Sequence, residues 1–255
     1  MSKSTAGIIQ ARMGSSRLPG KVMLPLGGRF ELEHVVERVS RATEIDTVIV
    51  ATTTKTADDI VAWCAEDAGV SVFRGDESNV LDRLYRAAES VDADEVVRIT
   101  ADCPLLDPAV VDEVVLRRRA AGVDYASNIL ERTFPRGLDV EAFSWGSFEH
   151  VYDCATDPAE LEHVTLYYRD NPSEFSLSNV SSTDVYDEES LLDRTDLRLT
   201  LDEAADYRLL RAIFDGLEYE NTPSFRDAVR YIDDNQLTSI NRAVTQKAPN
   251  DARSH

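Results

Sequence analysis

The first half of the chain alternates short apolar runs with stretches in which apolar residues recur every three or four positions. The apolar runs at 6–10, 47–51, 71–73 and 95–100 predict buried strands. Helical spacing around 32–39, 57–68 and 80–88 predicts helices between them, and the pair Asp107-Pro108 suits the start of another. This alternation predicts an α/β fold in which helices cover both faces of a parallel sheet.

The second half of the chain is less regular. We expect strands near 125–127, 140–143, 175–180 and 197–200, and helices over 144–156, 159–170, 204–215 and 224–234. No internal repeat or linker is evident, so we expect one domain over residues 1–245. The polar segment 246–255 is predicted to be a disordered tail.

The charge of the chain is unusual. Asp and Glu number 47 against 27 Lys and Arg, which gives a formal net charge of −20, and only four of the 27 basic residues are lysines, so 23 are arginines. An acidic surface with little lysine is typical of proteins from salt-loving microbes, although an ordinary acidic cytosolic protein is the alternative. Such a surface disfavours nucleic acid and anionic membranes as partners.

The remaining composition points to a cytoplasmic protein. The segment 1–10 lacks the apolar stretch of a signal peptide, and no run of about 18 apolar residues could span a membrane. The three cysteines are far apart and form no CxxC pair, which makes a zinc site improbable and favours a reducing compartment.

The loop after the first predicted strand carries most of the candidate chemistry. Residues 11–21 read ARMGSSRLPGK, and Gly14 allows a tight turn close to a ligand. Successive backbone N–H groups with the hydroxyls of Ser15 and Ser16 can hold phosphate oxygens. The loop also concentrates positive charge in an acidic chain, through Arg12, Arg17 and Lys21. These features predict a triphosphate site rather than a basic surface turn, although the spacing matches neither a P-loop nor a dinucleotide motif.

An acidic residue follows the fourth predicted strand, in the segment Thr100–Ala101–Asp102–Cys103–Pro104. Loops at the carboxyl ends of parallel strands hold ligands in α/β proteins, and a carboxylate there suits Mg²⁺. A turn or helix cap is the alternative. We interpret the neighbouring Cys103 as a packed thiol.

The residues quoted above resemble a known family. The segment IIQARMGSSRLPGKVMLPLGG contains the pattern G-x-S-R-x-P-x-K, formed by Gly14, Ser16, Arg17, Pro19 and Lys21. It is similar to the opening of cytidylyltransferases that make CMP-activated acidic sugars, with the greatest likeness to the branch named after spore-coat polysaccharide biosynthesis protein F. The resemblance extends through 72–88, 98–108, 127–143, 161–168 and 198–210, and so covers most of 6–242. It implies a Rossmann-like nucleotide-diphospho-sugar transferase fold with a mostly parallel mixed sheet.

The resemblance also implies roles for individual residues. Arg12, Arg17, Lys21 and Asp102 would be catalytic, and Asp102 and Asp202 would hold Mg²⁺. The nucleotide would contact Ala11, Arg12, Gly14, Ser15, Ser16, Lys21, Arg74 and Thr100, with Arg74 near the base, and the sugar would contact Gly137, Asp139 and Glu162. Asp202 as a helix cap and Arg74 as a surface ion pair are the alternatives. His163, on a predicted helix, is interpreted as structural rather than as a general base.

These assignments predict a magnesium-dependent transfer of CMP from CTP to a 2-keto acid sugar, with release of pyrophosphate, for surface polysaccharide or glycan synthesis. The resemblance further implies a homodimer, with a dimerisation element at roughly 125–180. The rival functions are nucleotidyl transfer with another base or acceptor, a nucleotide-sugar-dependent glycosyltransferase, and a non-catalytic binding protein. A glycosyltransferase commonly has a D-x-D pair after a strand, and this chain has Asp102 without a second Asp there.

Overall fold

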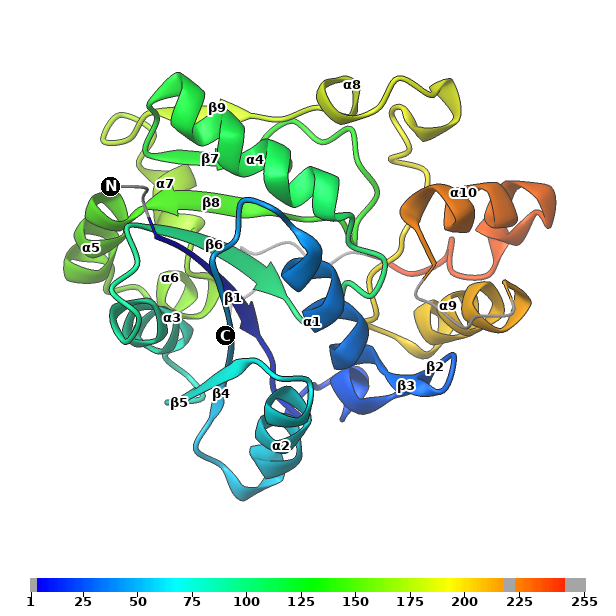
Figure 1. The fold of residues 1–255 in the computed structure, drawn as a ribbon, viewed down its shortest axis with the longest axis horizontal. Coiled ribbons are helices and arrows are strands. Elements are labelled where there is room, and N and C mark those ends of the chain that lie inside the picture. Colours follow the sequence, from blue (N-terminus) through cyan, green and yellow to red (C-terminus); the bar gives the residue numbers. More distant parts are fainter. Residues whose placement is uncertain (1–3, 218–222, 246–255) are drawn as a thin grey trace.

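A seven-stranded sheet forms the centre of the computed structural model, which describes residues 4–217 and 223–245 (Figure 1). The strands are β1 (Thr5–Gln10), β4 (Thr47–Thr53), β5 (Ser71–Gly75), β6 (Glu95–Thr100), β7 (Tyr125–Ser127), β8 (Glu141–Ser144) and β9 (Leu177–Asn179). Their order is β5-β4-β1-β6-β8-β7-β9. β8 runs antiparallel to both of its neighbours, and every other pairing is parallel. The mostly parallel mixed sheet expected from the sequence is therefore confirmed.

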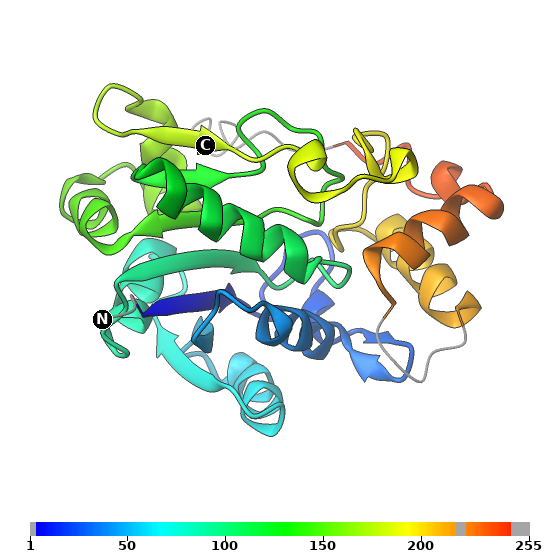
Figure 2. The same cartoon turned by 45° about the horizontal axis from the view of Figure 1, so that its top comes forward.

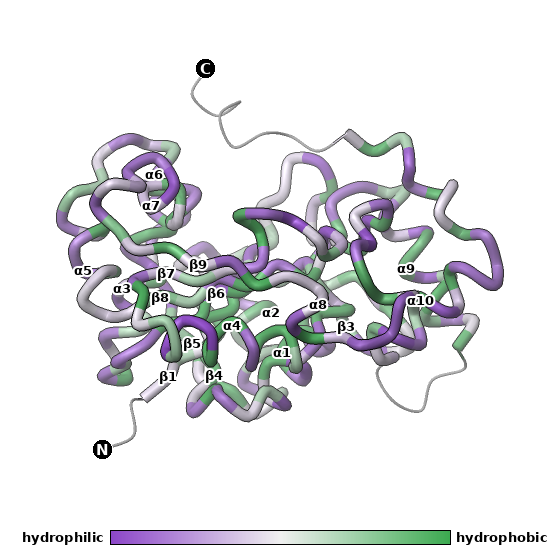
Figure 3. The backbone as a smooth tube through the Cα atoms, turned by 90° about the horizontal axis from the view of Figure 1, so that it is seen from above, coloured by the Kyte–Doolittle hydropathy of each residue, from purple (hydrophilic) through white to green (hydrophobic). Residues whose placement is uncertain are grey.

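Helices cover both faces of this sheet. The helices α1 (Glu31–Arg41), α2 (Asp59–Asp67) and α4 (Pro108–Ala121) pack on one face, and α3 (Val80–Glu89), α5 (Trp145–Cys154), α6 (Pro158–His163) and α7 (Leu166–Asp170) pack on the other. Successive side chains of a strand point to opposite faces, so Ile9 joins the first layer and Ile8 the second. Hydrophobic positions run through the middle of the molecule, and hydrophilic ones recur along its outer loops (Figure 3).

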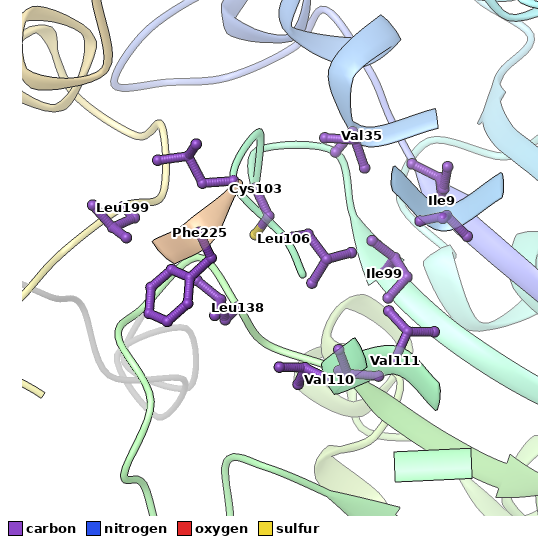
Figure 4. Close-up of a cluster of buried hydrophobic side chains, with 14 of the residues drawn as sticks. Ile9, Val35, Ile99, Cys103, Leu106, Val110, Val111, Leu138, Leu199 and Phe225 are labelled. Atoms are coloured by element: carbon purple, nitrogen blue, oxygen red, sulfur yellow. The ribbon is translucent and has the colours of Figure 1, made fainter. Parts of the chain in front are cut away.

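The larger hydrophobic cluster supports the loop that follows β6. In Figure 4, Ile9 and Ile99 from adjacent strands lie beside Val35 of α1, while Cys103 and Leu106 of the loop lie near Leu138. Cys103 is 2% exposed, so the prediction of a packed thiol is confirmed. Because this packing surrounds the loop on several sides, the position of the neighbouring Asp102 is set by the core.

The structure corrects two secondary-structure predictions. Residues 197–200 form no strand: they make an isolated bridge between Arg136 and Arg198, and their alternating leucines are buried against loops rather than paired in the sheet. The predicted helix 159–170 is two helices, because Val164 adopts a positive φ of 47° between α6 and α7. The buried hydroxyl of the next residue, Thr165, donates to Glu141, and this contact draws the chain out of the helix.

The hairpin β2 (Pro25–Leu26) and β3 (Arg29–Phe30) and the helices α9 (Ala204–Gly216) and α10 (Phe225–Asp234) gather at one end of the molecule (Figures 1 and 2). The short helix α8 (Ser182–Val185) packs against α4. Short 3-10 turns occur at Lys21–Met23, Thr56–Asp58, Glu189–Leu191 and Leu237–Ser239. The hairpin is held to α9 because the hydroxyl of Tyr207 donates to the carbonyl of Pro25 at 2.9 Å.

Two further predictions concern the extent of the chain. Among the described residues, no helix is long and apolar enough to cross a membrane. The predicted tail 246–255 lies outside the described residues. The single domain over 1–245 stays a prediction.

Candidate functional site

A cavity of about 640 Å³ opens at the carboxyl ends of β1 and β6. It lies where ligands bind in open α/β sheets. Most of the predicted site residues line it, namely Ala11, Arg12, Gly14, Ser15, Ser16, Arg17, Lys21, Thr100, Asp102, Glu162 and Asp202. The fold therefore brings together residues that are up to 191 positions apart (11 to 202) around one space.

The loop after β1 is held in a tight turn by its own backbone. The carbonyl of Met13 accepts hydrogen bonds from Ser15 N at 3.0 Å and from Gly20 N at 2.9 Å. Gly20 has a φ of 72°, a value that glycine adopts without strain. From outside the loop, Asp58 accepts a hydrogen bond from Met13 N at 2.6 Å. The basic residues of the loop and its two serines line the cavity.

Lys21 connects the two predicted metal ligands. Its Nζ lies 2.6 Å from Asp102 Oδ2 and 2.8 Å from Asp202 Oδ1. Burial opposes the charged form of Lys21, but the two carboxylates outweigh it and raise the pKa of the lysine. Burial likewise raises the pKa of Asp102, yet Lys21 overcomes this effect and lowers that pKa to about 2. Both groups are therefore charged over the whole physiological range.

Arginines compensate the charge of Asp202 as well. Arg17 Nη2 lies 2.8 Å from the same Oδ1 that Lys21 contacts. Arg198 Nη2 lies 2.8 Å from Oδ2, and Arg198 also pairs with the buried Asp206. Oδ1 of Asp202 thus contacts side chains of the loop after β1, and Oδ2 contacts Arg198.

The donor set at this point fits a divalent cation. Asp102 Oδ2 and Asp202 Oδ1 converge on one position, which the Lys21 ammonium fills. Carboxylate oxygens suit Mg²⁺, which usually takes one or two protein carboxylates and completes its shell with water and phosphate oxygens. Within 4–217 and 223–245, no group of three or more His, Cys, Asp or Glu side chains forms a metal cluster. A cation held by these two carboxylates would complete its shell with water and with oxygens of a bound phosphate.

A buried ion pair that sequence reasoning missed lies at the floor of the cavity. Arg98 of β6 pairs with Glu141 of β8, and its Nε donates to Gln10 at 3.0 Å. Glu141 also accepts hydrogen bonds from Tyr125 at 2.7 Å and Thr165 at 2.5 Å. Burial raises the pKa of Glu141, but Arg98 and these donors reverse the effect and lower it. A single arginine in the apolar run EVVRIT was the signal for this site in the sequence.

His163 lines the cavity next to this pair. Burial is the main cause that lowers its pKa, so the imidazole is neutral near pH 7. It can offer a hydrogen bond to a ligand without adding charge.

Two more buried charged residues lie near the cavity. Arg83 of α3 lines it, is 2% exposed, and has no hydrogen-bond partner for its Nε among the described residues. Glu31, at the start of α1, is fully buried, and neither of its carboxyl oxygens has a partner among them. Burial first, and the charge of Asp102 second, raise the pKa of Glu31. The sequence allowed Arg83 as either a pocket residue or a packing residue, whereas Glu31 read as an ordinary polar position of an amphipathic helix.

Arg74, Gly137 and Asp139 do not line this cavity. Arg74 donates to the carbonyl of Thr53 at 2.8 Å and pairs with Asp59 at 2.7 Å. Asp139 makes two hydrogen bonds with Arg132, at 2.6 and 2.9 Å. Gly137 has a φ of 108°, and a Cβ there would lie 2.5 Å from a backbone atom of residue 199. Their proposed ligand contacts remain predictions.

Comparison with protein families agrees with this arrangement. Residues 6–226 match a family model described as cytidylyltransferase. The chain belongs to this family. The protein is therefore an enzyme, a nucleotidyltransferase. The family resemblance that was inferred from the loop after β1 is confirmed.

Individual relatives support the same assignment. The spore coat polysaccharide biosynthesis protein SpsF of Bacillus subtilis is 34% identical over 81% of this chain and 85% of that protein. A 3-deoxy-manno-octulosonate cytidylyltransferase of Solibacter usitatus is 36% identical over 46% of this chain and 45% of its own length. The solved structure of a cytidylyltransferase from Leptospira borgpetersenii is 32% identical, covers 97% of this chain and 100% of its own, and superposes with a TM-score of 0.84.

Proposed function

We propose that this cytidylyltransferase transfers CMP from CTP to an acidic sugar, a 2-keto acid, and uses Mg²⁺ to do so. The observation that carries the proposal is the convergence of Lys21, Asp102 and Asp202 beside a phosphate-type loop in one cavity. The acceptor class follows from the relatives, because one is named for spore coat polysaccharide synthesis and another for 3-deoxy-manno-octulosonate. The product would serve surface polysaccharide or glycan synthesis.

The loop after β1 would hold the triphosphate. Backbone N–H groups at Gly14 and Ser16 and the hydroxyls of Ser15 and Ser16 would donate to phosphate oxygens, with Arg12 and Arg17 supplying charge. The acceptor hydroxyl would attack the α-phosphate in line, so that a new P–O bond forms while the bond to pyrophosphate breaks. Such a reaction depends mainly on positioning the reactants and neutralising their charge. The hydrogen-bond donors of this loop would serve the first purpose and its basic side chains the second.

Asp102 and Asp202 would hold Mg²⁺, which would neutralise negative charge on the phosphoryl oxygens. Arg198 would keep Asp202 oriented through its second oxygen. Lys21 would contact the phosphates from the same side as the metal ligands. The role of each of these residues in the reaction is part of the proposal.

The acceptor would lie over the floor of the cavity. Arg98 is fixed by Gln10 and Glu141, and its Nη2 makes no hydrogen bond within 4–217 and 223–245. That nitrogen is suited to a carboxylate or hydroxyl oxygen of a sugar acid. Glu162 and His163 line the same space and would contact sugar hydroxyls. We retain Gly137 and Asp139 as acceptor contacts, which requires their loop to rearrange on ligand binding. We also retain Arg74 as a base contact, which requires its side chain to leave Thr53 and Asp59.

We also propose a homodimer, with a dimerisation element within 125–180, and a surface adapted to high salt. The dimer follows from the family resemblance, and the salt adaptation from the net charge of −20 with little lysine. Sedimentation equilibrium would test the dimer, and urea unfolding across a range of salt concentrations would test the adaptation. A monomer at all concentrations would refute the dimer, and full stability at low salt would refute the adaptation.

The test of the proposed function is pyrophosphate release from CTP with Mg²⁺ in high salt. The acceptor panel would include 3-deoxy-manno-octulosonate and N-acetylneuraminate, and ATP, GTP and UTP would serve as nucleotide controls. We expect release only with CTP and a sugar acid. Release with another nucleotide would refute the choice of base, and release without any sugar acid would refute the acceptor class.

A further inference from the structure

The Lys21 ammonium occupies the point on which the two predicted metal-binding carboxylates converge. It lies 2.6 Å from Asp102 and 2.8 Å from Asp202, and all three side chains are at most 19% exposed. A divalent cation bound to the same two oxygens would require this position. We propose that Lys21 and the divalent cation compete for Asp102 and Asp202, so that the enzyme takes up metal and nucleotide together as a chelate. This inference rests on the proposed metal site.

Lys21 is the cation that must move, because among the residues that the structure describes it alone bridges both carboxylates. Of these two carboxylates, Arg17 contacts Asp202, and its other terminal nitrogen lies 4.0 Å from Glu203. Arg198 contacts Oδ2 of Asp202 and also pairs with Asp206. It can therefore stay in place when Oδ1 of Asp202 exchanges Lys21 for a metal ion. The charge of Asp202 therefore remains partly compensated throughout the exchange.

A bound triphosphate would give the displaced ammonium a new anionic partner within the cavity. Lys21 starts a 3-10 turn at the end of the loop after β1, and its long, flexible side chain shares the cavity with Arg12, Ser15 and Ser16. Phosphate oxygens held by that loop can accept the hydrogen bonds that Lys21 gives up. Without them, a metal would have to displace two charge-assisted hydrogen bonds and leave a desolvated ammonium unpaired.

This arrangement predicts coupling between the two ligands. Free metal would bind weakly because Lys21 competes with it, and the nucleotide would raise metal affinity by attracting Lys21 away. By linkage, the metal would raise nucleotide affinity by the same factor. The chemical class of ligand for this site is thus a divalent-metal chelate of a nucleoside triphosphate.

The test is a titration of the full-length protein with Mn²⁺ in the absence of nucleotide, followed by electron paramagnetic resonance of the free ion. Lys21→Met removes the ammonium and keeps most of the side-chain volume. We expect this variant to bind one Mn²⁺ at least about tenfold more tightly than the unmodified protein, because no charge-assisted hydrogen bonds must be broken. Lys55→Met is the matched control, since Lys55 is 59% exposed and pairs with Glu77 away from the two carboxylates. It should leave the affinity unchanged.

Two further variants keep the outcome decisive. Lys21→Gln retains hydrogen-bonding capacity without charge, and it replaces Lys21→Met if that variant does not fold by circular dichroism. Adding Asp102→Asn to either variant should abolish the gain, which would locate the ion between the two carboxylates.

Folded Lys21 variants that bind Mn²⁺ no more tightly than the unmodified protein would overturn the inference. A gain that survives Asp102→Asn would also overturn it. The proposed function has a separate readout, pyrophosphate release with a sugar acid, so the two can fail independently.

Discussion

Replacing Glu141 by Gln should destabilise the protein, because it leaves the Arg98 guanidinium without its counter-charge. The two side chains are only 5% and 12% exposed, respectively. Breaking a buried ion pair on one side costs about 3–5 kcal/mol. Gln can keep the hydrogen bonds from Tyr125 and Thr165, and the cavity admits water to Arg98, so we expect the low end, about 3 kcal/mol. For a chain of this size that corresponds to a melting temperature lower by roughly 6–12 °C.

The measurement is urea unfolding of Glu141→Gln, Arg98→Gln and the double variant, in the same high-salt buffer. The double variant should be more stable than Glu141→Gln, because it no longer buries an unpaired charge. Asp215→Asn is the control: Asp215 forms an exposed pair with Arg211, and such pairs contribute little to stability. Equal stability of Glu141→Gln and the unmodified protein, or no recovery in the double variant, would refute the role assigned to this pair.

Three further predictions concern the site and the core. Asp102→Asn should retain the fold by circular dichroism but lose Mg²⁺-dependent pyrophosphate release by at least about 100-fold; an unchanged response to Mg²⁺ would show that the metal assignment is wrong. Arg98→Gln should raise the KM for the sugar acid about tenfold or more and leave the KM for CTP nearly unchanged; the reverse pattern in steady-state kinetics would move Arg98 to the nucleotide side. Burial lowers the pKa of His34 to about 4, so the unfolded chain binds the proton more readily than the folded protein. The stability that neutral His34 contributes is therefore present above about pH 6.5 and is lost as the pH falls toward 4, where the loss reaches about 3 kcal/mol. His34→Gln should remove that part of the pH dependence of urea unfolding, and an unchanged profile would contradict the assignment.

The strands of the first half and the loop after β1 could be predicted because their signals are local. A strand buried on both faces of a parallel sheet is a continuous apolar run, as in 95–100, and its end marks where the ligand loop begins. Arg12, Arg17, Lys21 and Asp102 follow β1 and β6 directly, and these two strands are neighbours in the sheet. Once the fold class is known, these residues are therefore expected to lie close together at the carboxyl ends of the two strands.

The floor of the cavity could not be predicted, because it depends on how distant segments pair. Glu141 reaches Arg98 only because β8 inserts antiparallel beside β6, and no local pattern specifies that neighbour. The segment 197–200 has the period-2 pattern of a strand, but its leucines are buried between loops instead. Gly137 matches a family motif, and its close approach to the backbone of residue 199 is visible only in three dimensions.

The most direct test of the central claim is mass spectrometry of the product formed from CTP, Mg²⁺ and a panel of sugar acids. The account predicts a compound with the mass of CMP joined to one sugar acid, formed by the unmodified enzyme and at least about 100-fold more slowly by a folded Lys21→Ala variant. Failure to form any CMP-sugar across the panel would contradict transfer to a sugar acid. Equal rates for the two proteins would contradict the cavity around Lys21 as the site of that transfer.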